Sequence, residues 1–334
     1  MIVFYFIDDV IRDLESPTRE DLHKFRVKVE DDYAGFLGIE IIHHEDGRVE
    51  LRQTGLIDRI ITALNLTGGD VTIRHTPAEK DALGKDEEGP PRQESWSYPS
   101  LIGMLLYLSS NTRPDVTFAV NSCARFNHCA KLIHEKGVKR IARYLKGTRD
   151  KGLIFDPNKA LQLEMYCDAD FAGLWNSENR DEATSVKSRS GIIITLGGVP
   201  VTWNSKLQNL IATSTMMAEY VALSYGMREL LPIKRQIEEI CSLLKIDRDE
   251  NTRIVKVHED NEGALKLANS PVTKITPQSK HFAVKLHWFR SMVMDKAMNF
   301  ELNYVKTERQ KADIFTKGLL VTEFRKKRKL IMGW

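Results

Sequence analysis

The stretch Leu161–Gly173, LQLEMYCDADFAG, constrains the fold more than any other part of this sequence. Apolar and polar residues alternate from Leu161 to Asp168, which is the period of a β-strand with one buried face. Asp168 ends this strand on its polar face, just before the turn Phe171–Gly173. An acid at the end of a strand is usually a turn or capping residue. The positions of three later acids favour another interpretation.

Three further acids follow, each at the end of a strand or near the start of a helix. Glu219 falls in the first two turns of a predicted helix that opens with the Ser/Thr cluster Thr213–Thr215. Asp260 ends the apolar strand Ile254–Val257, and Asp313 opens a short helical segment. The order along the chain is therefore strand-end Asp, helix Glu, strand-end Asp and helix Asp.

This order of acids resembles the ribonuclease H fold with its four-carboxylate site, and the residues around each acid are more specific. They resemble the C-terminal RNase H domain of copia-type LTR retrotransposon Pol polyproteins, and the resemblance extends over nearly the whole chain. The motifs that carry it are Tyr166–Gly173, Ser190-Gly191 with Leu196-Gly197-Gly198, Trp203 with Ser205-Lys206 and Gln208, Ala218-Glu219-Tyr220, Asp260-Asn261, Ser279-Lys280-His281, and Ala312–Lys317 with Leu319.

The second half of the chain has the alternation of strands and helices that this resemblance implies. The resemblance implies the fold class α/β (α+β), with an RNase H-like fold that has a five-stranded mixed sheet flanked by helices. A break or a new first helical turn is expected at Pro232. The predicted strands are 161–168, 191–196, 199–204, 254–257 and 299–305, and the predicted helices are 216–231, 233–244, 261–268, 280–294 and 310–319.

The beginning of the chain resembles the palm hairpin of reverse transcriptases. An apolar strand, Met1–Val10, runs into Asp8 and Asp9, with Phe6 in place of the usual Tyr. Such carboxylates hold metal ions against an incoming triphosphate. The parts of a polymerase that precede this hairpin are absent, so we expect Asp8 and Asp9 to be remnant metal ligands. We expect this chain alone not to extend primers.

The rest of residues 1–155 resembles a truncated palm, thumb and connection region, which places the domain division at 1–155 and 156–334. The charged residues 11–32 contain a predicted helix at 20–29. A strand is expected at 35–42, with its return strand at 48–52 and surface residues His43 and His44 at the turn. The other expected elements are helices 57–66, 98–108, 114–126 and 131–145, a loop at 67–91 and a linker at 150–160.

Several basic and polar residues are candidates for nucleic-acid contact, although the net charge of +3 is too small to indicate such a partner. One predicted helix carries a basic stripe that is either a solvated face or a phosphate contact. The run Arg325–Lys329 is either a solvated tail or a nucleic-acid or localisation segment. The stripe is Lys136, Lys139, Arg140 and Arg143, and the candidates by position only are Lys187, Arg189, Ser190, Lys206 and Asn261.

The four acids have distinct roles in the resemblance, which implies two Mg²⁺ ions with Mn²⁺ as a possible substitute. Asp168 bridges both ions, Glu219 and Asp260 hold the ion on the leaving-group side, and Asp313 holds the ion beside the attacking water. Asp170 is expected to be a supporting or turn residue. Glu259 adjoins Asp260, but the strand alternation points it the other way. The loop 306–310 has no histidine, so turnover is expected to be slow.

The functional hypothesis is a Mg²⁺-dependent endoribonuclease that acts on the RNA strand of RNA–DNA hybrids. Two alternatives remain: a decayed element fragment that binds nucleic acid without cleaving it, or part of a working RNA-directed DNA polymerase when the missing portion is supplied. Expected partners are the hybrid, other nucleic acid and other parts of the Pol polyprotein. The short run Ile2–Ile7 is neither signal peptide nor membrane span. Four cysteines without a C-x-x-C pair are typical of an intracellular protein, here cytoplasmic in a virus-like particle or nuclear.

Overall fold

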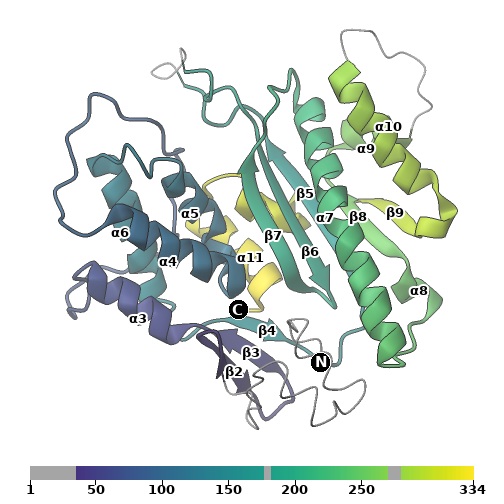
Figure 1. The fold of residues 1–334 in the computed structure, drawn as a ribbon, viewed down its shortest axis with the longest axis horizontal. Helices are drawn as coiled ribbons and strands as arrows, with labels where there is room; N and C mark the ends of the chain where they lie inside the picture. Colours follow the sequence, from purple (N-terminus) through teal and green to yellow (C-terminus); the bar gives the residue numbers. More distant parts are fainter. Residues whose placement is uncertain (1–34, 177–181, 270–279) are drawn as a thin grey trace, which may run out of the picture.

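Two β-sheets form the framework of the molecule (Figure 1). The computed structural model describes residues 35–176, 182–269 and 280–334. The predicted hairpin with Asp8 and Asp9, and the predicted helix at 20–29, lie outside the described residues.

The larger sheet has five strands and is mixed, as the sequence predicts. Its central strand pairs antiparallel with one neighbour and parallel with the other, and the register sets Asp168 opposite Gly191. The order of strands and helices along the chain is the one that the resemblance to RNase H implies. In spatial order the strands are β7 (Val199–Leu207), β6 (Arg189–Leu196), β5 (Leu163–Asp170), β8 (Val255–Glu259) and β9 (Phe300–Tyr304).

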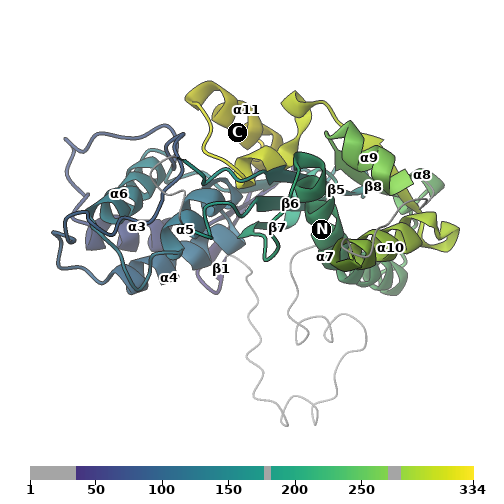
Figure 2. The same ribbon diagram turned by 90° about the horizontal axis from the view of Figure 1, so that it is seen from above.

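The central strand β5 is buried on both faces, so the expectation of one solvated face is wrong. Cys167 packs in a core with the helices α7, α9 and α10, whereas Tyr166 belongs to the core on the other face. Figure 2 shows α7 and α10 on one side of the sheet and α11 on the other. Asp168 is consequently only 4% exposed. The helices are α7 (Thr215–Leu243), α9 (Glu262–Asn269), α10 (Lys280–Met294) and α11 (Val321–Met332).

Helix α7 runs without interruption through Pro232, which corrects the predicted break at that residue. Proline removes one backbone hydrogen bond and clashes with the preceding turn, at a cost of about 3 kcal/mol. Ile237 and Cys241, beyond the proline, are buried in the same core as the residues before it. Burial of the second half of the helix therefore offsets the local cost.

The last predicted helix, 310–319, is also different in the structure. A short 3₁₀ segment, η5 (Lys311–Phe315), carries Asp313, and the separate helix α11 follows. The basic run Arg325–Lys329 is part of this helix and is not a free tail. The apolar residues Phe324, Ile331 and Met332 of α11 are buried. The shorter elements nearby are α8 (Glu250–Arg253), η3 (Lys296–Met298) and η4 (Thr307–Arg309).

The first half of the chain forms a four-stranded antiparallel sheet. Two predictions for this region are wrong. The single strand expected at 35–42 is a hairpin whose turn residues Leu37 and Gly38 have φ of 50° and 74°. The expected linker 150–160 contains the fourth strand, β4, which pairs antiparallel with β3, the return strand predicted at 48–52. The strands are β1 (Gly35–Phe36), β2 (Ile39–His43), β3 (Val49–Arg52) and β4 (Leu153–Phe155).

The helices predicted at 57–66, 98–108, 114–126 and 131–145 are present, and their core continues onto the five-stranded sheet. This core also contains Ile193 of β6, Phe315 of η5 and Phe324 of α11. The indole Nε1 of Trp203 donates to the carbonyl of Ser109 at 2.7 Å. The domain division at 155/156 stays a prediction. The helices are α3 (Thr54–Ala63), α4 (Tyr98–Asn111), η1 (Pro114–Val116), α5 (Thr117–Ala124) and α6 (Leu132–Lys146).

A buried ion pair in this core gives a stability prediction. Arg113 donates from Nε and Nη2 to Asp115 at 2.9 and 2.8 Å, and the hydroxyl of Tyr144 donates to the same carboxylate at 2.5 Å. We expect Arg113→Met to lower the free energy of unfolding by about 3–5 kcal/mol, because Asp115 stays buried without its cation. Urea denaturation measures this. The matched control is Arg149→Met, whose pair with Asp58 is partly exposed and is worth about 1 kcal/mol or less. Equal losses in both variants would contradict the prediction.

Candidate active site

Three of the four predicted acids converge at one edge of the five-stranded sheet. One oxygen each of Asp168, Glu219 and Asp260 lies within 4.8 Å of the others. Asp168 and Asp260 meet because β5 and the parallel strand β8 both end at this edge. Glu219 lies at the start of α7, where the side chain of Ser214 caps the helix by accepting from the amide of Met217 at 3.2 Å. We refer to these three side chains as the three-acid cluster.

Neighbouring hydroxyl and amide groups hold two members of this cluster in place. The hydroxyl of Thr316 donates to Oδ2 of Asp168. Asp260 accepts from the hydroxyl of Thr307 at 2.9 Å and from Nε2 of Gln310 at 3.5 Å. Glu219 is 5% exposed, and its Oε2 has no hydrogen-bond partner among the residues that the structure describes.

Burial makes ionisation of Asp168 and Glu219 unfavourable. It raises the pKa of Asp168 to about 7, and the charges of Asp313 and Asp260 add to this while Lys317 opposes it. Burial likewise raises the pKa of Glu219 well above its usual range, with the nearby charge of Glu259 as the next cause. Such a site gains most from an external cation that neutralises the carboxylates.

Asp313 lies close to the cluster but is engaged by two lysines. Its charge contributes to the raised pKa of Asp168. Its Oδ1 lies 2.9 Å from Nζ of Lys317, and its Oδ2 lies 2.6 Å from Nζ of Lys327. In the described part of the chain, the members of the three-acid cluster have no ion pair of this kind. The structure therefore brings three predicted acids together and keeps the fourth beside them in ion pairs.

Two further acids, Asp170 and Glu259, lie within two residues of members of the cluster in the sequence. Asp170 is half-buried at the end of β5, and its carboxylate packs against the backbone of Gly173, where an added Cβ would lie 1.5 Å from Oδ2. Glu259 is fully buried and accepts from the amide of Asn261 at 3.0 Å. Neither residue belongs to the three-acid cluster, but the charge of Glu259 acts on Glu219.

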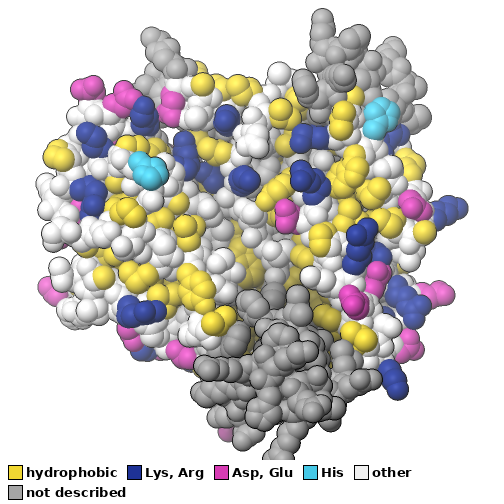
Figure 3. All heavy atoms as spheres, viewed as in Figure 1, with side chains coloured by type: hydrophobic (Ala, Val, Ile, Leu, Met, Phe, Trp, Pro, Cys, Tyr) yellow, Lys and Arg dark blue, Asp and Glu magenta, His cyan; other side chains and the backbone are white. Residues whose placement is uncertain are grey.

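The basic stripe predicted on α6 is partly committed to contacts inside the protein. Nζ of Lys139 lies 2.5 Å from Glu94, and Nη1 of Arg140 lies 2.7 Å from Glu79. Lys136 is exposed, and Arg143 is half-buried. Figure 3 shows Lys and Arg side chains scattered among apolar and polar atoms, so the described surface in this view carries no single basic stripe.

The residues that are candidates for nucleic-acid contact by position only differ in how deeply they are buried. Arg189 and Ser190 are 4% and 3% exposed, and the hydroxyl of Ser190 accepts from Gln208 at 2.9 Å. Lys206 is exposed and Lys187 is half-buried. The side chain of Asn261 caps α9 by accepting from the amide of Ala264 at 3.0 Å.

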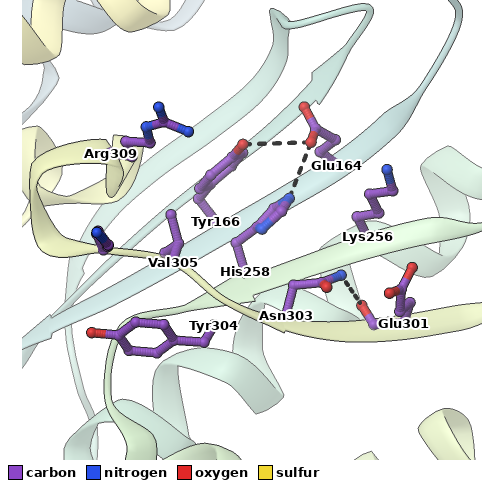
Figure 4. A pocket seen from close by; sticks show the side chains of 10 residues that line it. Glu164, Tyr166, Lys256, His258, Glu301, Asn303, Tyr304, Val305 and Arg309 are labelled. Atoms are coloured by element: carbon purple, nitrogen blue, oxygen red, sulfur yellow. Dashed lines mark hydrogen bonds and ion pairs between the residues drawn. The ribbon is translucent and has the colours of Figure 1, made fainter.

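A separate cavity of about 560 Å³ lies on the same sheet, over β5, β8 and β9 (Figure 4). Glu164, which lines this cavity, accepts from Nε2 of His258 at 3.0 Å, and the rings of His258 and Tyr166 stack with centroids 4.3 Å apart. Lys311 adds its ammonium group 4.5 Å from the Tyr166 ring centre. None of the four predicted acids lines this cavity.

Sequence reasoning missed several residues that support the site. Gln310 is fully buried and joins the last loop to β5 by donating from Nε2 to the carbonyl of Cys167 at 2.7 Å. Thr316 and Lys327 were not singled out, although each contacts a predicted acid. A signal for Lys327 is present, because it shares one helical face with Phe324 and Ile331, at spacings of three and four residues.

The donor set of the three-acid cluster fits a divalent metal ion. Three carboxylates supply the hard oxygen ligands that Mg²⁺ and Mn²⁺ prefer. The unpaired Oε2 of Glu219, buried among other acids, is an orphaned acceptor that such an ion would satisfy in the described site. Among the residues that the structure describes, every helix is too short or too polar to cross a lipid bilayer.

Comparison with protein-family models finds no match. Curated relatives include the retrovirus-related Pol polyprotein from transposon RE1 of Arabidopsis thaliana, 31% identical over 327 residues, and that from transposon TNT 1-94 of Nicotiana tabacum, 29% identical over 328 residues. These matches cover 96% and 95% of this chain. The chain spans only 21% and 23% of the length of the two relatives.

Solved structures that resemble the chain include the N-terminal RNase H domain of a Mycobacterium tuberculosis protein. That match has 11% identity and a TM-score of 0.32, and it covers 47% of this chain and 91% of that one.

Proposed function

The chain belongs to the family of copia-type retrovirus-related Pol polyproteins, and from this premise we propose that it is a metal-dependent endoribonuclease that hydrolyses the RNA strand of RNA–DNA hybrids. The observation that carries the proposal is the three-acid cluster, whose oxygens lie within 4.8 Å of one another. Buried acids that converge without an ion pair lower the stability of the fold. Such clusters are typical of functional sites, and a bound metal ion would neutralise their charge.

The proposed ions are Mg²⁺, with Mn²⁺ as a substitute. When bound, such ions make a water nucleophilic and neutralise the leaving oxygen of a phosphodiester. Asp168 lies close to both Asp260 and Asp313, whose charges act on it, and the hydroxyl of Thr316 orients its carboxylate. The hydroxyl of Thr307 and the amide of Gln310 fix the orientation of Asp260.

Substrate contact is proposed at the basic residues that remain accessible beside the site. Lys206 at the end of β7 is exposed, and Lys187 precedes β6. On α6, Lys136 is exposed, whereas Lys139 and Arg140 would first have to leave Glu94 and Glu79. Recognition of a hybrid requires contacts to 2′-hydroxyls on one strand and to a DNA backbone on the other.

The proposal is tested with the purified chain and an RNA–DNA hybrid labelled on its RNA strand. We expect cleavage of that strand with Mg²⁺ and none with EDTA, because the carboxylates need the ion to act on the phosphodiester. Single-stranded RNA, duplex RNA and duplex DNA should stay intact. Asp260→Asn should lower the rate at least 100-fold, and cleavage by this variant at the parent rate would contradict the assignment.

A second candidate function is nucleic-acid binding without cleavage. One observation favours it, namely that both oxygens of Asp313 are held by lysines. In that case the same assay would give salt-sensitive binding of the hybrid without a Mg²⁺-dependent product.

A further inference from the structure

The four acids of the site divide into two electrostatic groups. The three-acid cluster has no lysine or arginine within ion-pair distance in the described part of the chain, whereas Asp313 has two lysines. Asp313 and its two lysines together carry a net charge of +1. The two ammonium groups therefore oppose the binding of a dication next to Asp313.

Lys327 is the fixed member of this group. Its side chain is 3% exposed, and besides Asp313 its Nζ donates to the carbonyls of Thr307 and Gln310, the latter at 2.9 Å. Its helix α11 is attached to the first half of the chain through the ring of Phe324, which packs edge-on against Tyr144 at 5.5 Å. Lys327 therefore orients Asp313 and is not free to leave it.

Lys317 is the member that can move. Its side chain is 42% exposed, so its ammonium group can reach solvent without disturbing the core. Burial opposes its charge, but the carboxylates of Asp168 and Asp313 raise the pKa of Lys317 above its usual value. Its ammonium group thus lies in the field of the two acids that a second ion would have to share.

Resting on the proposed function, we propose that the ammonium group of Lys317 holds the place between Asp168 and Asp313 that a second divalent ion needs. The substrate-free protein therefore binds one divalent ion, at the three-acid cluster. A second ion enters only when Lys317 leaves Asp313. Lys327 stays in place and acts as the positioning residue for Asp313.

The test counts bound Mn²⁺ in the full chain without nucleic acid, by isothermal titration calorimetry and by electron paramagnetic resonance of the free ion. We expect one ion per chain for the parent and for Lys317→Arg, which keeps the positive charge. Lys317→Met should bind two, with a second-site affinity at least tenfold higher than that of the parent. The matched control is Lys326→Met, an exposed lysine of α11 that pairs with Glu323 and should bind one ion.

Two outcomes would overturn the inference: two ions of similar affinity in the parent, or a single ion in a folded Lys317→Met variant. Circular dichroism and thermal melting establish that the variant is folded. Asp260→Asn separates this inference from the proposed function. If that variant binds Mn²⁺ like the parent, the three-acid cluster is not the metal site and the proposed function fails as well.

Discussion

Replacing Asp168 with Asn should abolish hybrid cleavage while making the metal-free protein more stable. We expect the single-turnover rate to fall by at least three decades, or about 4 kcal/mol at about 1.4 kcal/mol per decade. The reason is that Asp168 belongs to the three-acid cluster and also lies close to Asp313. Labelled hybrid with Mg²⁺ measures the rate, and urea denaturation in EDTA measures the free energy of unfolding.

The gain in stability follows from the raised pKa of Asp168. That pKa is about 7 in the folded protein and about 3.9 in an unfolded chain. At pH values between these two pKa values, Asp168 keeps its proton in the folded state but has lost it in the unfolded state. The stability of the metal-free parent therefore falls as the pH rises from about 4 to about 7. The variant lacks this loss, which amounts to about 4 kcal/mol at most, and should therefore exceed the parent most above pH 7.

A surface variant controls for the change from Asp to Asn itself. The side chain of Asp247 is 96% exposed, and its contact with Arg253 at 3.4 Å lies away from the acids. Asp247→Asn should leave both the cleavage rate and the pH dependence of stability unchanged. An Asp168→Asn protein that cleaves like the parent, or that is less stable than the parent at pH 8, would refute the placement of Asp168 in a buried acid cluster.

Local periodicity is enough to predict the two strands that end near Asp168 and Asp260. The alternation in Leu161–Asp168 and the β-branched run Ile254–Val257 indicate two strands, and each ends at an acid. The resemblance to a known family implies that the acids converge at one end of the sheet. Strand periodicity and this resemblance together predict that Asp168 and Asp260 meet, and the structure brings their oxygens within 4.8 Å of each other.

The elements that the sequence does not predict correctly are stabilised by contacts with residues distant in the sequence. Strand β4 is three residues long and is stabilised by pairing with β3, about a hundred residues earlier, so its own sequence carries little signal. The basic run Arg325–Lys329 suggests either a solvated tail or a nucleic-acid or localisation segment, because charge dominates its composition and hides the helix α11. Its apolar residues Phe324 and Ile331 pack against elements distant in the sequence. The pairing of Lys327 with Asp313 depends on that packing and has no local signature.

Gly191→Ala should displace the 3₁₀ segment that carries Asp313. Gly191 lies opposite Asp168 in the sheet, and an added Cβ would lie 2.7 Å from Cγ2 of Thr316 and 2.8 Å from the carbonyl oxygen of Ala312. Because the second contact is with backbone, η5 must shift as a whole. We expect a loss of about 1–3 kcal/mol in the free energy of unfolding. We also expect a loss of about 100-fold in cleavage, since misplacement by about 1 Å costs that much.

The control for Gly191→Ala is an equally crowded glycine on the other face of β5. An added Cβ at Gly226 of α7 would lie 2.7 Å from Sγ of Cys167 and 2.8 Å from Sδ of Met165. The thioether of Met165 can turn aside because it ends a flexible side chain, and Ala gains about 1 kcal/mol of helix propensity over Gly. Gly226→Ala should keep cleavage within about threefold of the parent, because the side chains that it crowds, Cys167 and Met165, pack in the core on the other face of β5 from η5. If both variants lose cleavage equally, general loosening of the sheet explains the effect, and the close approach of η5 to Gly191 has no special role in positioning Asp313.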